Sequence, residues 1–281
     1  SGRAPTDLTL EEFKKRGLEK IPALGPLPVS VPGAVDGWFE LHDKFGSMPM
    51  KELLNPAIEY AEKGFPLTQL IAWYMNRSVP LYEGRGFPNI RETYLDQNGG
   101  RLPKEGEIYR NPFLANTYRQ IAEGGRDAFY KGKIAKTIAD FIQSQGGYLS
   151  TKDLASHSSE WVTPVSVNYR GYDVWELPPN GQGIAALQML QILEGYDFSN
   201  IAFGSPEHLH LFTEAKKLAF EDRAKYYADP DFAPAPVETL LSDKYASERR
   251  KLIQDKAGQY SAGEISAGET IYMTVADAAG N

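Results

Sequence analysis

The sequence of 281 residues contains no cysteine. A disulfide framework, a thiolate nucleophile and a zinc site built on cysteine are therefore excluded. The absence of cysteine does not indicate a compartment, because such a protein works equally well inside and outside the cell. Any chemistry in this chain depends on other side chains.

Basic residues are fewer than acidic ones, with 30 Lys and Arg against 37 Asp and Glu, which gives a formal net charge of −7. No basic block occurs, so a nucleic-acid backbone is not expected as a partner. No apolar run reaches the length of a bilayer span, and the start Ser1-Gly2-Arg3 lacks the layout of a signal peptide. We expect a soluble protein without a membrane partner, either cytoplasmic or secreted or periplasmic.

Histidine is also scarce, with four residues in the chain. His208 and His210 lie two positions apart on a predicted helix and therefore point to different faces, which is wrong for shared metal binding. His42 and His157 stand alone in the sequence. We expect all four to be structural or solvated, and we expect neither a metal site nor a cofactor.

Helix signals dominate the remaining sequence, whose 42% hydrophobic and 24% charged residues are typical of a globular protein. Apolar periodicity and capping residues predict helices over residues 10–16, 34–45, 50–63, 111–123, 133–145, 184–194, 206–227 and 237–256. Alternating β-type runs predict strands at 165–169 and 172–177, and a short strand with a turn at 29–35. Dense Pro, Gly and Asn between 79 and 112 predict a long, mostly irregular excursion.

Two loops and one arginine are weak candidates for a site. Gly181-Gln182-Gly183 follows a predicted strand, but it lacks the Lys-Ser/Thr of a P-loop and the third Gly of a dinucleotide fingerprint, so a tight connection explains it better. Asp229-Pro230-Asp231 could bind a cation, although turn chemistry explains both carboxylates. Arg3, outside any predicted helix, either anchors a carboxylate through its fork of donors or is simply exposed.

The last dozen residues form a separate pattern. A Gly-rich and Ser-rich approach gives way to a β-type run in which Ile271, Met273 and Val275 alternate with other residues, so a strand beginning at Thr270 is predicted. A Thr at the head of a strand is explained by β-propensity alone. The preceding sequence gives this Thr a second interpretation.

In order along the chain, the sequence resembles the γ-glutamyltransferase (γ-glutamyl transpeptidase) family. The segments that carry the resemblance are Val31-Pro32-Gly33-Ala34-Val35-Asp36-Gly37-Trp38, Leu54-Asn55-Pro56-Ala57-Ile58, Tyr169-Arg170-Gly171-Tyr172 with Pro178-Pro179, Glu214-Ala215 through Asp222-Arg223 to Asp229-Pro230-Asp231-Phe232, and Glu269-Thr270-Ile271-Tyr272-Met273-Thr274-Val275-Ala276-Asp277. Each block is unspecific by itself, whereas their order and joint spacing are specific.

The resemblance implies an α+β fold, the αββα sandwich of N-terminal-nucleophile (Ntn) hydrolases, in which a precursor cuts itself and exposes a catalytic Thr. By its place in the motif, this Thr is Thr270 and scission falls at Glu269–Thr270. Residues 1–269 are then the helix-rich large-subunit portion of a single Ntn-hydrolase domain. Residues 270–281 begin the small subunit, whose remainder we expect outside this sequence.

The chemistry agrees with such a role. A Thr hydroxyl needs a base, and an N-terminal Thr supplies one in its own α-amine, whose pKa is about 8 in model peptides. We expect an acyl-enzyme on Thr270, formed from a small-molecule γ-glutamyl amide of the glutathione type and passed to water or to an amine. The enzyme is then an autocatalytically processed zymogen with hydrolase and transferase activity, and its small subunit derives from the same precursor.

Two departures from the family pattern widen the choice of substrate. The family's Arg-Glu-x-Ala-Pro is replaced by Ser1-Gly2-Arg3-Ala4-Pro5, which places Arg3 two positions later, and Pro-Pro-x-Ser-Ser-Gly-Gly becomes Pro178-Pro179-Asn180-Gly181-Gln182-Gly183. Both indicate the divergent γ-glutamyltransferase-like or cephalosporin-acylase-like branch. A glutaryl-type β-lactam acylase and a non-catalytic ligand-binding relative therefore remain alternatives.

Overall fold

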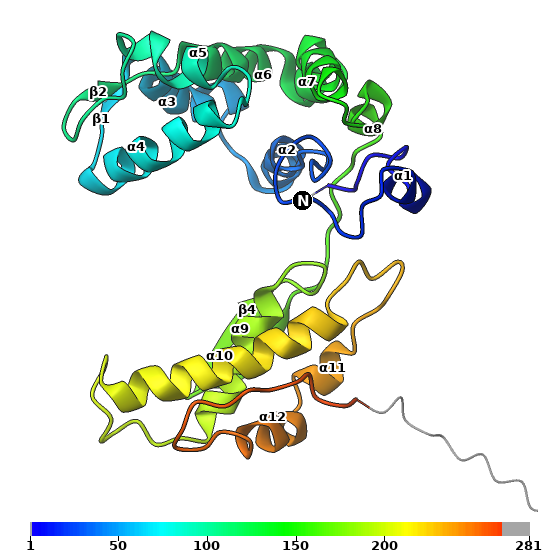
Figure 1. Ribbon diagram of the computed structural model, residues 1–281, viewed down its shortest axis with the longest axis vertical. Coiled ribbons are helices and arrows are strands. Elements are labelled where there is room, and N and C mark those ends of the chain that lie inside the picture. Colours follow the sequence, from blue (N-terminus) through cyan, green and yellow to red (C-terminus); the bar gives the residue numbers. More distant parts are fainter. Residues whose placement is uncertain (1, 266–281) are drawn as a thin grey trace, which may run out of the picture. The chain divides into compact units, whose positions relative to one another are not determined.

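The structure, a computed structural model, describes residues 2–265, so that Glu269 and Thr270 lie outside the described residues (Figure 1). The chain forms two compact units, Ser1–Glu160 and Trp161–Asn281. Helices predominate in both units, and the described strands form two antiparallel sheets of two strands each. No helix among residues 2–265 is long and apolar enough to cross a membrane.

The first unit consists of helices and one short β-bridge between strands of two residues. Its elements are α1 (Leu10–Lys15), α2 (Ala34–Phe45), α3 (Met50–Lys63), β1 (Phe65–Pro66), α4 (Gln69–Gly84), α5 (Ile90–Tyr94), the 3₁₀ helix η1 (Asp96–Asn98), β2 (Ile108–Tyr109), α6 (Pro112–Tyr130), α7 (Lys133–Ser144) and α8 (Thr151–Ala155). Side-chain caps begin several of these helices: the Thr9 hydroxyl accepts the Glu12 N–H, and Ser150 with Asp153 forms a full capping box.

Helices α3 and α6 pack along each other in the centre of this unit, and α2 and α7 add to the same core (Figure 1). The buried members of this core are Val31, Val35, Leu54, Ile58, Ile121, Phe129, Tyr130, Ala135, Ala139, Leu149 and Leu154. Helix α6 is broken at Gly125, whose φ of 66° and ψ of −161° are accessible only to glycine. The turn after this break carries Arg126 and Tyr130.

The second unit packs a hairpin and two helices around a central helix. Its elements are β3 (Val165–Tyr169), β4 (Tyr172–Glu176), α9 (Gly183–Glu194), α10 (Pro206–Tyr226), α11 (Val237–Leu240) and α12 (Asp243–Arg250). Helix α9 contacts the hairpin, α10 and α12, and this surrounding explains why apolar residues occur all around it. The hairpin turns at Arg170 and Gly171, both with positive φ, as a two-residue connection requires.

Most predicted elements are confirmed, and three predictions are wrong. The strand predicted within 29–35 is absent, since residues 29–33 belong to no strand and Ala34 begins α2. Among the described residues, Val31 pairs by its backbone with Gly2 and Arg3, which is too little for a ladder. The stretch 79–112 is more regular than predicted: α4 runs through Pro80, and α5 follows. The predicted helix 237–256 is divided into α11 and α12, because Ser242 begins a new helix by accepting the Tyr245 N–H.

Candidate functional site

Of the predicted site residues, Arg3 lies in the first unit, whereas Glu269 and Thr270 fall outside the described part of the chain. The described residue nearest to Thr270 in the sequence is Ile265. Two described parts of the chain carry a predicted site residue or precede one in the sequence. One is the segment that leads toward Thr270, and the other is the N-terminal segment that carries Arg3.

The segment leading toward Thr270 lies along helix α10. Residues 258–265 form no helix or strand, and we call them the anchored segment. On α10, Glu214, Leu218, Asp222 and Tyr226 follow one another at intervals of four residues, so they share one face of the helix. Glu214 and Asp222 are buried to within 1% exposure. In Figure 1 the anchored segment runs beside α10, and hydrogen bonds from side chains of this face join the two.

Glu214 holds the start of the anchored segment. Its carboxylate accepts hydrogen bonds from the Gly258 backbone nitrogen at 2.9 Å and from the Tyr260 hydroxyl at 2.5 Å. Lys217 lies 2.5 Å from the same carboxylate and donates to the Gly258 carbonyl at 2.6 Å. Burial disfavours the charged form of Glu214, but these donors outweigh burial and lower its pKa to about 2. Burial and the Glu214 carboxylate raise the pKa of Tyr260 to about 12, so the phenol remains a donor.

Asp222 holds the middle of the anchored segment. One carboxylate oxygen accepts the Gly263 N–H at 2.8 Å and faces Arg249 at 3.1 Å, and the other accepts from Gln188 at 3.1 Å. Arg249 also donates to the Ser261 carbonyl at 2.9 Å. A buried ion pair is not in itself strongly stabilising, because both charges lose their hydration. Here both partners of the pair also bind backbone groups of the anchored segment, so the pair fixes a conformation.

Tyr226 holds the end of the anchored segment. Its hydroxyl donates to the Gly263 carbonyl at 2.6 Å and accepts the Ile265 N–H at 3.2 Å. One phenol therefore binds backbone groups on both sides of residue 264. Gly263 also lies against Tyr245, and a Cβ at this position would overlap the tyrosine hydroxyl. The close approach of the chain to α10 and α12 thus requires glycine here.

Arg3 is held by its backbone in the first unit. The Gly2 N–H donates to the Val31 carbonyl and the Val31 N–H donates to the Arg3 carbonyl, each at 3.0 Å. The guanidinium lies 3.9 Å from the Glu160 carboxylate, and the side chains are 66% and 74% exposed. An exposed pair of this kind is worth at most about 1 kcal/mol. The backbone pairing with Val31, more than the ion pair, therefore places Arg3.

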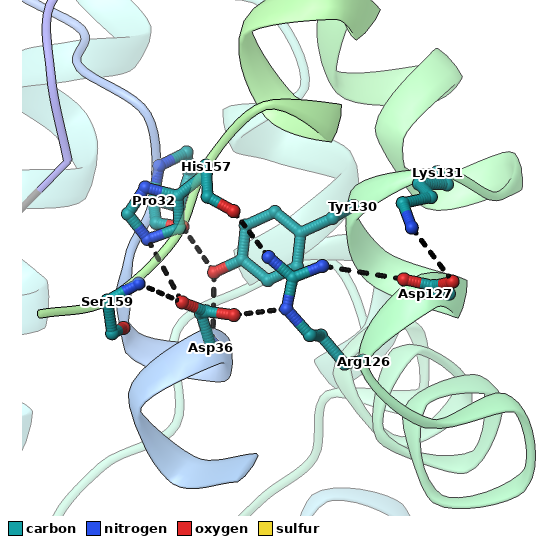
Figure 2. Close-up of polar contacts among 8 residues, drawn as sticks. All are labelled: Pro32, Asp36, Arg126, Asp127, Tyr130, Lys131, His157 and Ser159. Atoms are coloured by element: carbon teal, nitrogen blue, oxygen red, sulfur yellow. Dashed lines mark hydrogen bonds and ion pairs between the residues drawn. The ribbon is translucent and has the colours of Figure 1, made fainter. Parts of the chain in front are cut away.

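A buried polar cluster centred on Asp36 adjoins the loop whose Val31 pairs with Gly2 and Arg3 (Figure 2). The Asp36 carboxylate accepts from Arg126 and from the Ser159 backbone nitrogen, and Arg126 also donates to the His157 carbonyl. Burial disfavours the Asp36 anion, but hydrogen bonds from Ser159 and Arg126 outweigh it and lower its pKa. For His157, burial lowers the pKa against the opposing influence of Asp36, so the imidazole is neutral near pH 7.

Tyr130 connects this cluster to the loop that pairs with Arg3. Its hydroxyl accepts the Asp36 N–H at 3.0 Å and donates to the Pro32 carbonyl at 2.7 Å, as Figure 2 shows. The Tyr130 ring stacks on the His157 imidazole with centroids 5.4 Å apart. Residues 31–36 and 157–159 are thus joined into one block. The cluster supports the backbone that carries Arg3 and has the character of a structural network.

The other candidates from the sequence take part in turns, helix starts and local packing. Gly183 begins α9 directly against Glu176, which confirms the tight strand-to-helix connection. The Asp229 carboxylate accepts the Asp231 N–H at 3.0 Å, as turn chemistry predicts. His208 packs among Phe198, Phe203 and Phe212. Within residues 2–265, no group of three or more His, Cys, Asp or Glu side chains is placed to hold a metal ion.

Sequence reasoning missed Glu214 and Asp222 as holders of the anchored segment. Asp222 lies on a face of its helix that also carries Leu218, and a buried carboxylate there requires polar partners. The spacing of Glu214, Asp222 and Tyr226 is the signal that marks one polar line on α10. Their partners in the anchored segment follow 37 to 46 residues later in the chain, so no local pattern connects them.

Comparison with known proteins gives the family of the chain. The family model for gamma-glutamyltranspeptidase matches residues 1–281. The glutathione hydrolase-like YwrD proenzyme of Bacillus subtilis (strain 168) is 36% identical over 282 residues, which cover 100% of this chain and 52% of the relative. The chain therefore spans about half the length of this curated relative.

Two solved structures share the fold. Cephalosporin acylase from Bacillus halodurans matches with a TM-score of 0.84 and 42% identity, over 94% of this chain and 49% of the acylase chain. Helicobacter pylori gamma-glutamyltranspeptidase matches with a TM-score of 0.82 and 29% identity, over 96% of this chain and 79% of that chain. The α+β Ntn-hydrolase fold with a helix-rich segment, expected from the resemblance, is confirmed by these matches.

Proposed function

The chain belongs to the gamma-glutamyltranspeptidase family, and on this premise we propose that it is the large-subunit portion of a self-processing acyltransferase or hydrolase with Thr270 as nucleophile. The observation that carries the proposal is the family match over residues 1–281, which includes the Glu269-Thr270 motif. The word proenzyme in the name of the Bacillus subtilis relative agrees with a precursor that is cut.

In the proposed processing step, the Thr270 hydroxyl attacks the carbonyl carbon of Glu269. The new ester bond joins Glu269 to the Thr270 oxygen, the peptide C–N bond breaks, and the nitrogen takes up the hydroxyl proton. Water then hydrolyses the ester. The products are a Glu269 carboxylate and a free Thr270 with its α-amine, which divide the chain into residues 1–269 and a small subunit that begins at 270.

In the proposed catalytic cycle, the α-amine of Thr270 accepts the hydroxyl proton as the oxygen attacks a γ-glutamyl amide. An α-amine with a pKa of about 8 is partly unprotonated near neutral pH, which suits this role. The amine of the substrate leaves with the proton, and the acyl group stays on Thr270. Water or a second amine then accepts the acyl group. Arg3 is the proposed binder of the substrate carboxylate, through two parallel N–H donors.

A cephalosporin acylase is the second candidate function. The observation that favours it is the 42% identity to the Bacillus halodurans acylase, against 29% to the Helicobacter pylori transpeptidase. A glutaryl side chain ends in a carboxylate, as the γ-glutamyl group does, so Arg3 has the same proposed role in both. The two candidates differ in the group on the carbon beside that carboxylate, which is an ammonium only in the γ-glutamyl case.

The test uses the full-length protein that contains this chain. Intact mass and N-terminal sequencing should show a subunit beginning at Thr270 in the wild type and an uncut Thr270→Ala variant. Initial rates with γ-glutamyl-p-nitroanilide and glutaryl-p-nitroanilide then decide between the two candidates. If wild-type protein stays whole under all conditions, self-processing is wrong. Turnover that survives in Thr270→Ala contradicts the role of this residue.

A further inference from the structure

The anchored segment, residues 258–265, is fixed by side chains although it belongs to no helix or strand. Side chains bind its backbone at four positions. Lys217 and Glu214 bind Gly258, and Arg249 binds Ser261. Asp222 binds Gly263, and Tyr226 binds Ile265. An irregular stretch otherwise leaves such groups to water. Four of these five side chains come from helix α10 and the fifth, Arg249, from α12, so α10 makes most of the contacts.

We propose that helix α10, through the Tyr226 hydroxyl, positions the precursor chain for self-cleavage at Glu269–Thr270. This inference rests on the proposed function, because it concerns the same scissile peptide. Tyr226 is a positioning residue here: it binds the backbone at Gly263 and Ile265 and acts on the reaction through the chain. Nothing in this role requires the phenol to contact substrate.

Tyr226 binds the chain only a few residues before the predicted cleavage site. Ile265, whose N–H Tyr226 accepts, precedes Glu269 by four residues. Four residues reach at most about 14 Å when fully extended, so fixing Ile265 limits how far along the chain the scissile peptide can lie from it. Self-cleavage requires the Thr270 oxygen to reach the preceding carbonyl in a near-attack geometry, and removing freedom of the chain beforehand accelerates such a step.

The side chains that bind the anchored segment are suited to a positioning role at neutral pH. Glu214 has its pKa lowered to about 2, so the grip on Gly258 persists in acid to below the ordinary range of a Glu side chain. Buried charges such as Asp222 and Arg249 are costly, and an apolar contact of the same volume would serve stability equally well. Their hydrogen bonds to Gly263 and Ser261 instead select one path for the chain.

Cleavage ends this dependence. Once the peptide is cut, Thr270 starts a separate subunit, and the anchored segment holds only the end of the large subunit. The positioning role therefore predicts an effect on processing and not on turnover by molecules that are already cut. A purely structural role of Tyr226 would lower the processing rate, the turnover per cut molecule and the melting temperature together.

The experiment measures the rate at which freshly refolded full-length precursor is cut, by gel and intact mass. Tyr226→Phe removes only the hydroxyl, and we expect it to slow cleavage about tenfold, the effect of losing about 1.4 kcal/mol at the transition state. Ile265→Pro removes the N–H of the same contact from the other side and should act in the same direction. The matched control is Tyr227→Phe at the residue that follows α10, whose hydroxyl donates to Gln188 and, among the described residues, makes no hydrogen bond to the anchored segment; cleavage there should change less than about twofold.

Turnover of γ-glutamyl-p-nitroanilide and glutaryl-p-nitroanilide is then measured per cut molecule, together with the melting temperature. Slower cleavage in Tyr226→Phe and Ile265→Pro at preserved turnover supports the positioning role. If both variants are cut at the wild-type rate, or if turnover and melting temperature fall in parallel with cleavage, the inference is overturned while the proposed function stands. A wild-type precursor that is never cut overturns both.

Discussion

The carboxylate of Asp222 binds the backbone nitrogen of Gly263 at 2.8 Å across 41 residues of sequence. This contact links the longest helix of the second unit to the stretch of chain that precedes the predicted cleavage site. It also shows why the Asp222 position tolerates a charge although the residue is fully buried. Its oxygens accept from Gly263 and Gln188 and face Arg249, so the buried charge has donors on both oxygens.

Gly263→Ala should destabilise the second unit by about 1–3 kcal/mol, because the added methyl overlaps the Tyr245 hydroxyl and one of the two has to move. Urea unfolding followed by tryptophan fluorescence measures the change. Gly181→Ala is the matched control, since a Cβ at position 181 meets open space, and its unfolding free energy should change by less than about 0.5 kcal/mol. Equal midpoints for the two variants would show that the chain at 263 has room to shift.

Glu214→Gln should reduce stability in a pH-dependent way. The folded-state pKa of Glu214 is lowered to about 2 from 4.5, so the charged form contributes stability that is complete above about pH 5. This contribution is lost as the pH falls from there toward 2. We expect the variant to be less stable by about 2 kcal/mol at pH 7, as for hydrogen bonds to a charged group. The difference from wild type, measured by urea unfolding at several pH values, should shrink on acidification; a difference that stays constant down to pH 3 would contradict the assignment.

Arg3→Gln should weaken binding of substrates that carry a free carboxylate. The loss of two charge-assisted donors is expected to raise KM about tenfold or more with little effect on kcat. Arg3→Lys keeps the charge but not the fork, and it should give an intermediate KM. Steady-state kinetics with a γ-glutamyl amide measures both. Glu160→Gln removes the neighbouring carboxylate and serves as the control, and a KM change as large as that of Arg3→Gln would point to the ion pair instead of the substrate.

Asp36→Ala should destabilise the first unit by about 3 kcal/mol, because Arg126 and the Ser159 N–H lose a buried acceptor. Asp127→Ala is the control: it also pairs with Arg126, but its side chain is 59% exposed, and its loss should cost less than about 1 kcal/mol. Thermal unfolding of both variants measures the contrast. A loss of stability in Asp36→Ala as small as that in Asp127→Ala would mean that the cluster in Figure 2 contributes little to the fold.

Local signals predicted the helices well, because each boundary has a cause within a few residues. Thr9 and Ser205 cap their helices through the N–H three residues on, and Gly46 and Gly64 follow the ends of two others. The helix α4 was missed because its Pro80 lies inside the element, where a proline ordinarily ends a helix. Val79, directly before this proline, is buried.

The candidate site was only partly accessible from sequence. Motif order identified Thr270, Glu269 and Arg3, which stay predictions because neither the geometry nor the comparisons test them. The polar line of Glu214, Asp222 and Tyr226 could be seen on a helical wheel, yet its purpose depends on partners about 40 residues away. Contacts of that separation are decided by how helices pack, and no pattern within one helix records them.

The break of helix α6 at Gly125 restricts which residues can occupy position 125. The backbone there has a φ of 66° and a ψ of −161°, which an L-amino acid with a Cβ adopts only at considerable strain. Arg126 and Tyr130 follow directly, so the angle of this break aims both at Asp36. A single methyl group at position 125 would therefore misdirect two side chains at once, and random mutagenesis with selection for folding should return glycine there.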